Sequence, residues 1–187
     1  MIEIGSSAGL NLFVDAYGYA LGGDRRWGPA DAPLTIASDW RGSLPPLEQA
    51  LIVVRRVGCD RNPLDPAEPE TRERLLSYVW PDQSHRMQRL SAALDFAAST
   101  DVRVEAIDAA AFIERELARP QAFRTVRVIM HTVVWQYLPP ETRDRIATAL
   151  HRTGSMAQPD RPLVHLFVEA DGGPDATVMI EQWPGGE

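Results

Sequence analysis

The first residues along the chain that could bind a ligand or do chemistry form a glycine-rich turn, Glu3-Ile4-Gly5-Ser6-Ser7-Ala8-Gly9. The apolar, β-branched residues Ile2 and Ile4 predict a buried strand that leads into this turn. The glycines allow a tight bend into a following helix. Backbone N–H groups at such a bend can bind an anion or the polar edge of a ligand. Glu3, at the strand end, can accept a hydrogen bond from the same ligand.

Three interpretations of this turn are open. Glu3, Gly5 and Gly9 match the acidic-x-Gly-x-Gly-x-Gly loop of proteins that bind a nucleotide or S-adenosylmethionine, although Ser7 replaces the middle glycine. The pattern Gly5-x-Ser7-x-Gly9 also matches a nucleophile elbow, which would make Ser7 the nucleophile of a serine hydrolase. The third interpretation is a strand-to-helix turn that binds no ligand.

Two aspartates follow later predicted strands. Asp60 comes after the apolar run 51–57, and Asp108 comes after the run 102–107. In a doubly wound sheet, an acidic residue after the second strand binds ribose hydroxyls, and Asp108 would then lie near the adenine. Asp60 is farther from Gly9 than the usual spacing of roughly 20 residues, so an insertion at about 20–50 is required. The alternatives are an Asx turn or a helix cap for Asp60 and a helix N-cap for Asp108.

The fourth predicted strand, 125–130, runs into the cluster His131-Thr132-Val133-Val134-Trp135-Gln136-Tyr137. A histidine at the carboxyl end of a parallel strand can act as a general base near neutral pH. Trp135 and Tyr137 can then form the walls of an acceptor site. The alternative is a buried histidine that is hydrogen-bonded to the backbone among core aromatic residues.

The order of the predicted elements indicates the fold. Apolar spacing predicts helices at 10–19, 69–79, 83–99, 109–118 and 141–152, and strands at 2–4, 51–57, 102–107, 125–130, 163–168 and 177–183, with a possible edge strand at 34–40. Strands that alternate with helices predict a three-layer, doubly wound α/β fold with a mostly parallel sheet. The last two strands should form an antiparallel hairpin, as at the end of class I methyltransferases.

Composition excludes several classes of function. The chain has 187 residues, a length that suits a single domain spanning 1–187, and its net charge of −7 argues against nucleic acid as the main partner. All 19 basic residues are arginine, and the absence of lysine excludes a Walker phosphate loop and a pyridoxal phosphate Schiff base. A single cysteine, Cys59, predicts neither a disulfide framework nor a cysteine metal site, which fits the cytoplasm. No metal site and no membrane segment are predicted.

Five separated motifs together resemble a known family. They are the turn at 3–12, Arg56-Val-Gly-Cys-Asp-Arg-Asn-Pro-Leu-Asp65, Val79-Trp-Pro-Asp-Gln83 with Arg86, the cluster at 131–138, and Trp183-Pro-Gly-Gly186. In this order they resemble bacterial domain-of-unknown-function family 2332, whose members are uncharacterised proteins with a methyltransferase-like fold. The resemblance also implies that the chain is a core truncated at both ends, because family members are longer.

The resemblance and the motifs together predict an S-adenosylmethionine-dependent methyltransferase, or a methyltransferase-like protein, that acts on a small molecule. The expected cofactor-binding residues are Glu3, Gly5, Ser7, Gly9, Asp60 and Asp108, the expected base is His131, and the expected acceptor walls are Trp135 and Tyr137. Two alternatives remain: a non-catalytic methyltransferase-like scaffold that binds a ligand or a partner, and a hydrolase that uses Ser7. The sequence leaves the methyl acceptor and the oligomeric state open.

Overall fold

A computed structural model describes residues 1–170, 172–173 and 175–185. The chain divides into two compact units. The first comprises Met1–Ser7, Val57–Pro63 and Val104–Glu187, and the second comprises Ala8–Arg56 and Leu64–Arg103. The insertion predicted at about 20–50 belongs to the second unit. No helix in the described ranges is both long enough and apolar enough to cross a membrane.

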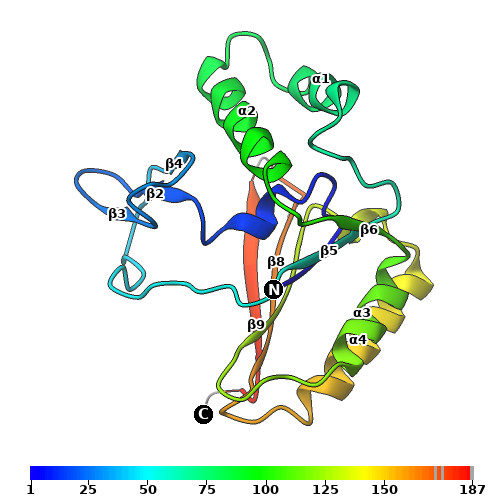
Figure 1. Ribbon diagram of the computed structural model, residues 1–187. Coiled ribbons are helices and arrows are strands. Elements are labelled where there is room, and N and C mark those ends of the chain that lie inside the picture. The colour runs from blue at the N-terminus through cyan, green and yellow to red at the C-terminus, as the bar shows by residue number, and fades with distance from the viewer. Residues whose placement is uncertain (171, 174, 186–187) are drawn as a thin grey trace. The chain divides into compact units, whose positions relative to one another are not determined.

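A six-stranded sheet forms the centre of the first unit (Figure 1). Its strands are β1 (Ile2–Ile4), β5 (Val57–Asp60), β6 (Val104–Ala106), β7 (Arg127–Thr132), β8 (Leu163–Ala170) and β9 (Ala176–Trp183). They lie in the order β6-β5-β1-β7-β8-β9, and every neighbouring pair is parallel except β8 and β9. The five parallel strands thus have the order 3-2-1-4-5 of a doubly wound sheet. In place of a sixth parallel strand, the antiparallel β9 pairs with β8.

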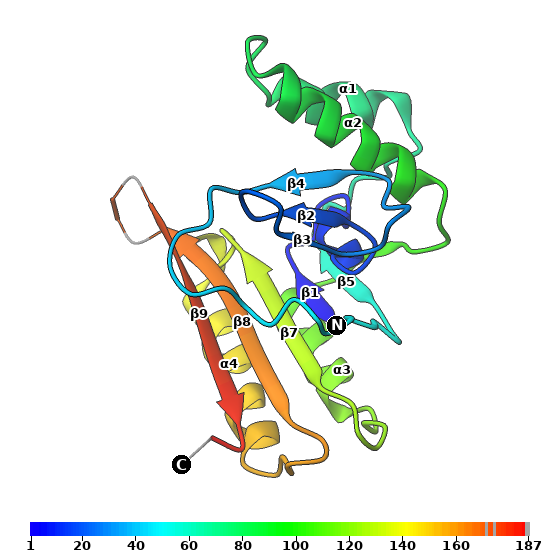
Figure 2. The same ribbon diagram turned by 90° about the vertical axis from the view of Figure 1, so that its left-hand side faces the viewer.

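Helices α3 (Ala109–Ala118) and α4 (Pro140–Gly154) lie side by side over one face of this sheet (Figures 1 and 2). Apolar side chains of the helices and strands form the core between them, with Ile4, Ile113, Ile129 and Ile146 fully buried. A short 3₁₀ helix, η2 (Trp135–Tyr137), follows β7. The prediction of a mixed α/β fold with a mostly parallel sheet is therefore confirmed. The antiparallel hairpin is confirmed too, although Asp171 and Pro174 of its turn lie outside the described residues.

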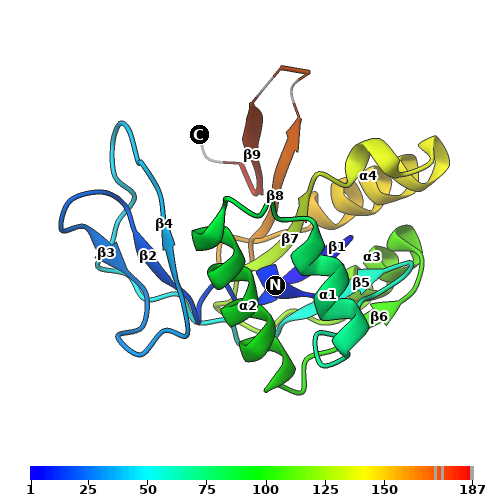
Figure 3. The ribbon, with the colours of Figure 1, turned by 90° about the horizontal axis from the view of Figure 1, so that it is seen from above.

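The second unit contains helices α1 (Pro69–Ser77) and α2 (Ser84–Ala98), the 3₁₀ helix η1 (Leu10–Phe13) and a small sheet. The small sheet consists of β2 (Gly18–Ala20), β3 (Arg26–Trp27) and β4 (Thr35–Ala37) in the order β3-β2-β4 (Figure 3). Phe13 packs edge-on against Phe96 of α2, with ring centroids 5.3 Å apart. Helices α1 and α2 were both predicted, to within two residues at either end.

One predicted element of the second unit is wrong, and another is shorter than predicted. The helix expected at 10–19 ends as a 3₁₀ helix at Phe13, and Gly18 already starts β2. Tyrosine hydroxyls stabilise the turns between them, because Tyr17 donates to the Leu10 carbonyl and Tyr19 to the Val14 carbonyl, each at 2.8 Å. The edge strand expected at 34–40 is present only as β4, and it pairs with β2 instead of extending the large sheet.

The strand predicted at 51–57 begins only at Val57, and it continues to Asp60. The apolar run before it lies outside any strand, with Ile52 78% exposed and Val54 77% exposed. Arg56 explains part of this difference. Its guanidinium forms two hydrogen bonds to the Asp15 carboxylate, at 2.7 and 2.9 Å, and one to the Leu12 carbonyl at 2.8 Å. This bidentate contact ties the chain before Val57 to the second unit.

Candidate functional site

The glycine-rich turn lies at the carboxyl end of β1, where the order of the parallel strands reverses between β1 and β7. Gly5 and Ser7 both have left-handed backbone conformations, with φ of 66° and 53°. A Cβ atom on Gly5 would lie 2.3 Å from Cγ2 of Val134, which follows β7. Glycine is therefore required at position 5, because the loop after β7 packs directly against the turn. In open α/β sheets this reversal is the usual place for a ligand.

Asp60 contacts the turn from the end of β5. One carboxylate oxygen accepts the backbone N–H of Ser7 at 2.9 Å, and the other accepts the N–H of Asn62 at 2.9 Å. The structure thus brings together two of the residues predicted to bind the cofactor. The bond to Asn62 confirms the Asx turn that the sequence offered as an alternative. The contact of Asp60 with ribose stays a prediction.

The other predicted cofactor residues are more dispersed. The Glu3 side chain is buried, only 1% exposed, within β1. Gly9 belongs to the second unit and precedes η1 with φ of 72°. Asp108 caps α3 by accepting the N–H of Ala111 at 3.1 Å, which confirms the N-cap interpretation. A contact of Asp108 with adenine stays a prediction.

His131 is the centre of a hydrogen-bonded network across β7, β8 and β9. Its side chain is buried, and its Nδ1 lies 2.7 Å from Oε1 of Glu169. Its Nε2 lies 3.1 Å from Nε2 of His165, whose Nδ1 lies 3.1 Å from Oε2 of Glu181. The network therefore runs Glu169–His131–His165–Glu181, from the partly exposed Glu169 through two buried histidines to the half-exposed Glu181. Both ring nitrogens of His131 are occupied by these contacts.

The number of protons limits this network. Three contacts require three hydrogens, whereas two neutral imidazoles supply only two. With both carboxylates ionised, one contact therefore lacks a hydrogen. The shortest contact is that of His131 Nδ1 with Glu169, where the imidazole donates to a carboxylate. If His165 then donates through Nε2 to His131, the contact between His165 Nδ1 and Glu181 is the incomplete one.

Burial controls the charge of the two histidines. It lowers the pKa of His131, a shift that the Glu169 carboxylate opposes, and it lowers the pKa of His165, a shift that Glu181 opposes. For Glu169, burial raises the pKa, but hydrogen bonds from Val134, Trp135 and His131 outweigh burial and the net shift is downward. Neutral histidines beside an ionised Glu169 follow from these shifts.

Glu169 also holds the loop after β7 in a strained conformation. The same oxygen that contacts His131 accepts the backbone N–H groups of Val134 and Trp135, at 3.0 and 3.1 Å. The preceding residue, Val133, has φ of 51°, which is an outlier for a β-branched side chain. Strained backbone of this kind occurs often at functional sites. The loop that packs on Gly5 is therefore held by one carboxylate at the end of β8.

The two predicted acceptor walls differ in position. Trp135 stacks on His131, with ring centroids 5.2 Å apart and an interplanar angle of 15°. Phe167 stacks against His131 as well, at 5.3 Å. Tyr137 is 75% exposed and takes part in none of these stacking contacts. The structure thus joins Trp135 to His131 and leaves Tyr137 at the surface.

Neither Ser7 nor Cys59 has the surroundings of an activated nucleophile. Within the described residues, no histidine forms a hydrogen bond with the Ser7 hydroxyl, so Ser7 lacks the base that a hydrolase needs. Cys59 is buried in β5, and burial raises the pKa of its thiol to about 12, which leaves it protonated and unreactive. The geometry gives the hydrolase alternative no support.

The comparison with protein families agrees with the motifs. Residues 1–187 match the family described as an uncharacterized protein conserved in bacteria (DUF2332). The chain belongs to this family. The predicted resemblance is thereby confirmed, and the DUF2332 match covers both compact units. Comparisons with curated proteins and with solved structures found no match.

Several residues of this candidate site were not among the predicted site residues: Val134, His165, Glu169 and Glu181. One signal was present in the sequence. The pattern His165-x-Phe167-x-Glu169 puts three side chains on one face of β8. The register then places Phe167 beside His131 of β7 and His165 beside Glu181 of β9. Only the pairing of the strands converts this pattern into a network.

Proposed function

We propose that the chain binds S-adenosylmethionine and transfers its methyl group to a small molecule. The observation that supports this most directly is the turn at Gly5–Ser7, in which Gly5 and Ser7 have left-handed conformations. The turn lies where the 3-2-1-4-5 order of the parallel strands reverses, and Asp60 at the end of β5 contacts it. Glu3, Gly5, Ser7 and Gly9 would bind the methionine and ribose side of the cofactor. Asp60 would bind the ribose, and Asp108 would lie near the adenine.

In this proposal His131 is the base and Trp135 and Tyr137 line the acceptor site. The bound cofactor would supply an electrophilic methyl group, and the chain would position the acceptor. Because both ring nitrogens of His131 contact other side chains, the histidine can take a proton only if one of these contacts opens. His131 is thus a base that depends on movement of Glu169 or His165.

A thermal-shift titration with S-adenosylmethionine and S-adenosylhomocysteine tests the cofactor site. A ligand that binds the folded state raises its melting temperature in a saturable way. The shift is expected for the natural chain and is expected to be lost in Asp60→Ala. Asp65→Ala is the matched control, because Asp65 also accepts the N–H two residues on, from Ala67, but lies outside the turn. Equal shifts in both variants, or none in the natural chain, would contradict the proposal.

A second candidate function, a non-catalytic scaffold with a methyltransferase-like sheet, is favoured by one contact. The Val134 side chain occupies the space where a Gly5 side chain would be, so that the loop after β7 closes over the turn. The variant Val134→Ala distinguishes the two candidates. A cofactor-dependent shift that appears only in this variant would show that Val134 blocks the turn. Cofactor binding together with S-adenosylhomocysteine production would favour the enzyme.

A further inference from the structure

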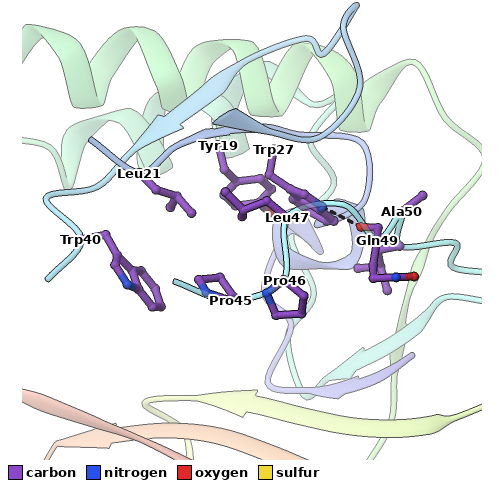
Figure 4. A pocket seen from close by; sticks show the side chains of 10 residues that line it. Tyr19, Leu21, Trp27, Trp40, Pro45, Pro46, Leu47, Gln49 and Ala50 are labelled. Atoms are coloured by element: carbon purple, nitrogen blue, oxygen red, sulfur yellow. Dashed lines mark hydrogen bonds between the residues drawn. The ribbon is translucent and has the colours of Figure 1, made fainter. Parts of the chain in front are cut away.

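The second unit contains a cavity that the proposed function does not use (Figure 4). Its volume is about 450 Å³, within the range of small-molecule sites. Tyr19 and Trp27, from β2 and β3, lie along one side, and Pro45 and Pro46 lie on the opposite side. Trp40 stands at one end of the cavity. All of these residues belong to one compact unit.

The polar groups of the three aromatic side chains are already hydrogen-bonded within the protein. The indole N–H of Trp27 donates to the Gln49 carbonyl at 2.8 Å, and that of Trp40 donates to the Ser43 carbonyl at 3.0 Å. The Tyr19 hydroxyl donates to the Val14 carbonyl. Since each polar group already has a partner in the protein, a ligand would contact mainly apolar ring surface. Large apolar rings around a ligand-sized cavity are typical of sites for flat, apolar molecules.

The charges near the cavity support a neutral ligand. No Asp, Glu, Arg or His lines it among the described residues. Asp15, Arg26 and Glu48 instead line an adjoining cavity of about 390 Å³. An ionised group in the first cavity would lose hydration without gaining a partner, which is costly. The lining therefore selects against charged ligands.

The cavity is also preformed. Proline fixes φ at two successive positions of its wall, Pro45 and Pro46, and restricts Leu44 before them. The hydrogen bond from Trp27 to Gln49 ties this wall to β3. At the end of β3, Gly28 has φ of 105°, and a Cβ there would lie 2.3 Å from the Tyr17 carbonyl oxygen. A preformed cavity needs little ordering when a ligand binds.

We propose that this cavity binds a neutral, ring-bearing small molecule against Trp40, Tyr19 and Trp27. The proposal is independent of methyl transfer, since none of its residues belongs to the site around Gly5 and His131. A small molecule is the expected occupant because the volume is that of a ligand and the two aromatic residues and the two prolines lie on opposite sides of it.

The test uses two probes that share one ring system. N-phenyl-1-naphthylamine is neutral, and 1-anilinonaphthalene-8-sulfonate is its sulfonated counterpart. We expect saturable fluorescence enhancement with the neutral probe on the full chain, and at least about tenfold weaker binding of the anionic probe. Equal affinity for both probes, or no saturable binding of the neutral probe, would overturn the proposal.

Two tryptophan variants locate the site. Trp40 is 41% exposed, so the Trp40→Ala variant should fold. Its affinity for the neutral probe should be about tenfold lower. Trp80→Ala is the matched control, because Trp80 is also exposed but lies outside the cavity. Trp40→Phe should retain most of the affinity and shows whether an aromatic ring suffices. If Trp40→Ala and Trp80→Ala weakened binding of the neutral probe equally, the assignment would be overturned. It would also be overturned if sedimentation showed that only self-associated protein binds the probe.

Discussion

At the scale of single residues, the strained loop after β7 gives the sharpest expectation. Val133 has φ of 51°, and its N–H donates to the Val168 carbonyl at 2.8 Å. A left-handed conformation costs about 1–3 kcal/mol for a non-glycine residue, and glycine relieves it at an entropic cost of about 0.5–1 kcal/mol. Val133→Gly should therefore raise the free energy of unfolding by about 1 kcal/mol, as measured by urea denaturation.

The adjacent valine is the matched control for this variant. Val134 has an ordinary φ of −120°, so Val134→Gly relieves no strain and removes the contact with Gly5. This second variant should be destabilised. If Val133→Gly were destabilised by as much as Val134→Gly, the conformation of Val133 would not be a source of strain.

The proton count of the network leads to a second residue-scale prediction. The glutamine in Glu181→Gln can donate from its amide to Nδ1 of His165, so that His165 donates through Nε2 to His131. All three contacts are then complete with neutral histidines. At pH 8 this variant should be more stable than the natural chain, by up to about 1 kcal/mol because the site is half exposed. Denaturant unfolding at pH 8 measures this difference.

Glu73→Gln is the control for the change of net charge, since Glu73 is exposed on α1. It should leave stability unchanged at pH 8. A loss of stability in Glu181→Gln would mean that the carboxylate of Glu181 already receives a proton from His165 in the natural chain.

Much of the candidate site could be predicted residue by residue, but its connections could not. Glycine spacing located the turn, and the position of His131 after an apolar run located the end of β7. The hydrogen-bond partners of His131, Glu169 and His165, both lie on β8, more than thirty residues away in the sequence. Strand pairing alone brings these residues together, and no local pattern encodes it. The predicted hairpin contained His165 and Glu181, yet only its register makes them neighbours.

At the scale of elements, prediction succeeded where a helix or strand buries one regular face. Helix α3 has Phe112, Ile113 and Leu117 buried at helical spacing, and its predicted bounds are correct. The prediction of a strand at 51–57 was wrong because the apolar run before Val57 is exposed and pairs with no strand that the structure describes. The observed strand, Val57-Gly58-Cys59-Asp60, has low strand propensity and is stabilised by its pairing with β1. Tertiary contacts, and not local sequence preference, therefore determine the position of this strand.

Packing of β9 against α4 gives a prediction at this scale. A Cβ atom on Gly154, at the end of α4, would lie 2.6 to 2.8 Å from ring atoms of Trp183. Alanine favours a helix over glycine by about 1 kcal/mol, but displacing a packed indole costs about 1–3 kcal/mol. Gly154→Ala should therefore lower the melting temperature despite its better helix propensity.

A double-mutant cycle isolates this contact. In a Trp183→Leu background the ring is gone, so Gly154→Ala should become neutral or stabilising. The same loss in both backgrounds would show that the cost arises from the helix end and not from Trp183.

At the scale of the whole molecule, the chain carries two different candidate sites, one in each compact unit. The first unit has a mostly parallel sheet with a polar network across β7, β8 and β9, and the second has an aromatic cavity whose lining, among the described residues, carries no charge. Sequence predicted the sheet because strands and helices alternate there regularly. Within the insertion at 20–50 it predicted only the possible edge strand at 34–40, because short strands separated by proline and glycine carry little periodic signal.

Stability against acid is the prediction that belongs to the whole chain. His131 and His165 have pKa values below the ordinary 6.5, so below pH 6.5 the unfolded chain binds protons that the folded chain does not. By linkage, the free energy of unfolding should fall as the pH drops from 8 through 6.5, with uptake of up to two protons on unfolding. Glu169, whose pKa is lowered from 4.5, should add a further fall below pH 4.5.

Urea unfolding across this pH range shows whether the free energy of unfolding falls with pH as expected. Two histidine variants test whether the buried histidines cause the fall. His165→Gln should weaken the fall between pH 8 and 5, because one of the two buried imidazoles is gone. His85→Gln should leave it unchanged, because His85 is exposed on α2. If stability instead rose toward pH 5, a third proton would be completing the Glu169–His131–His165–Glu181 network, and its hydrogen bonds would outweigh the cost of burying an imidazolium. The direction of this one slope therefore decides whether the network is built for neutral or for charged histidines.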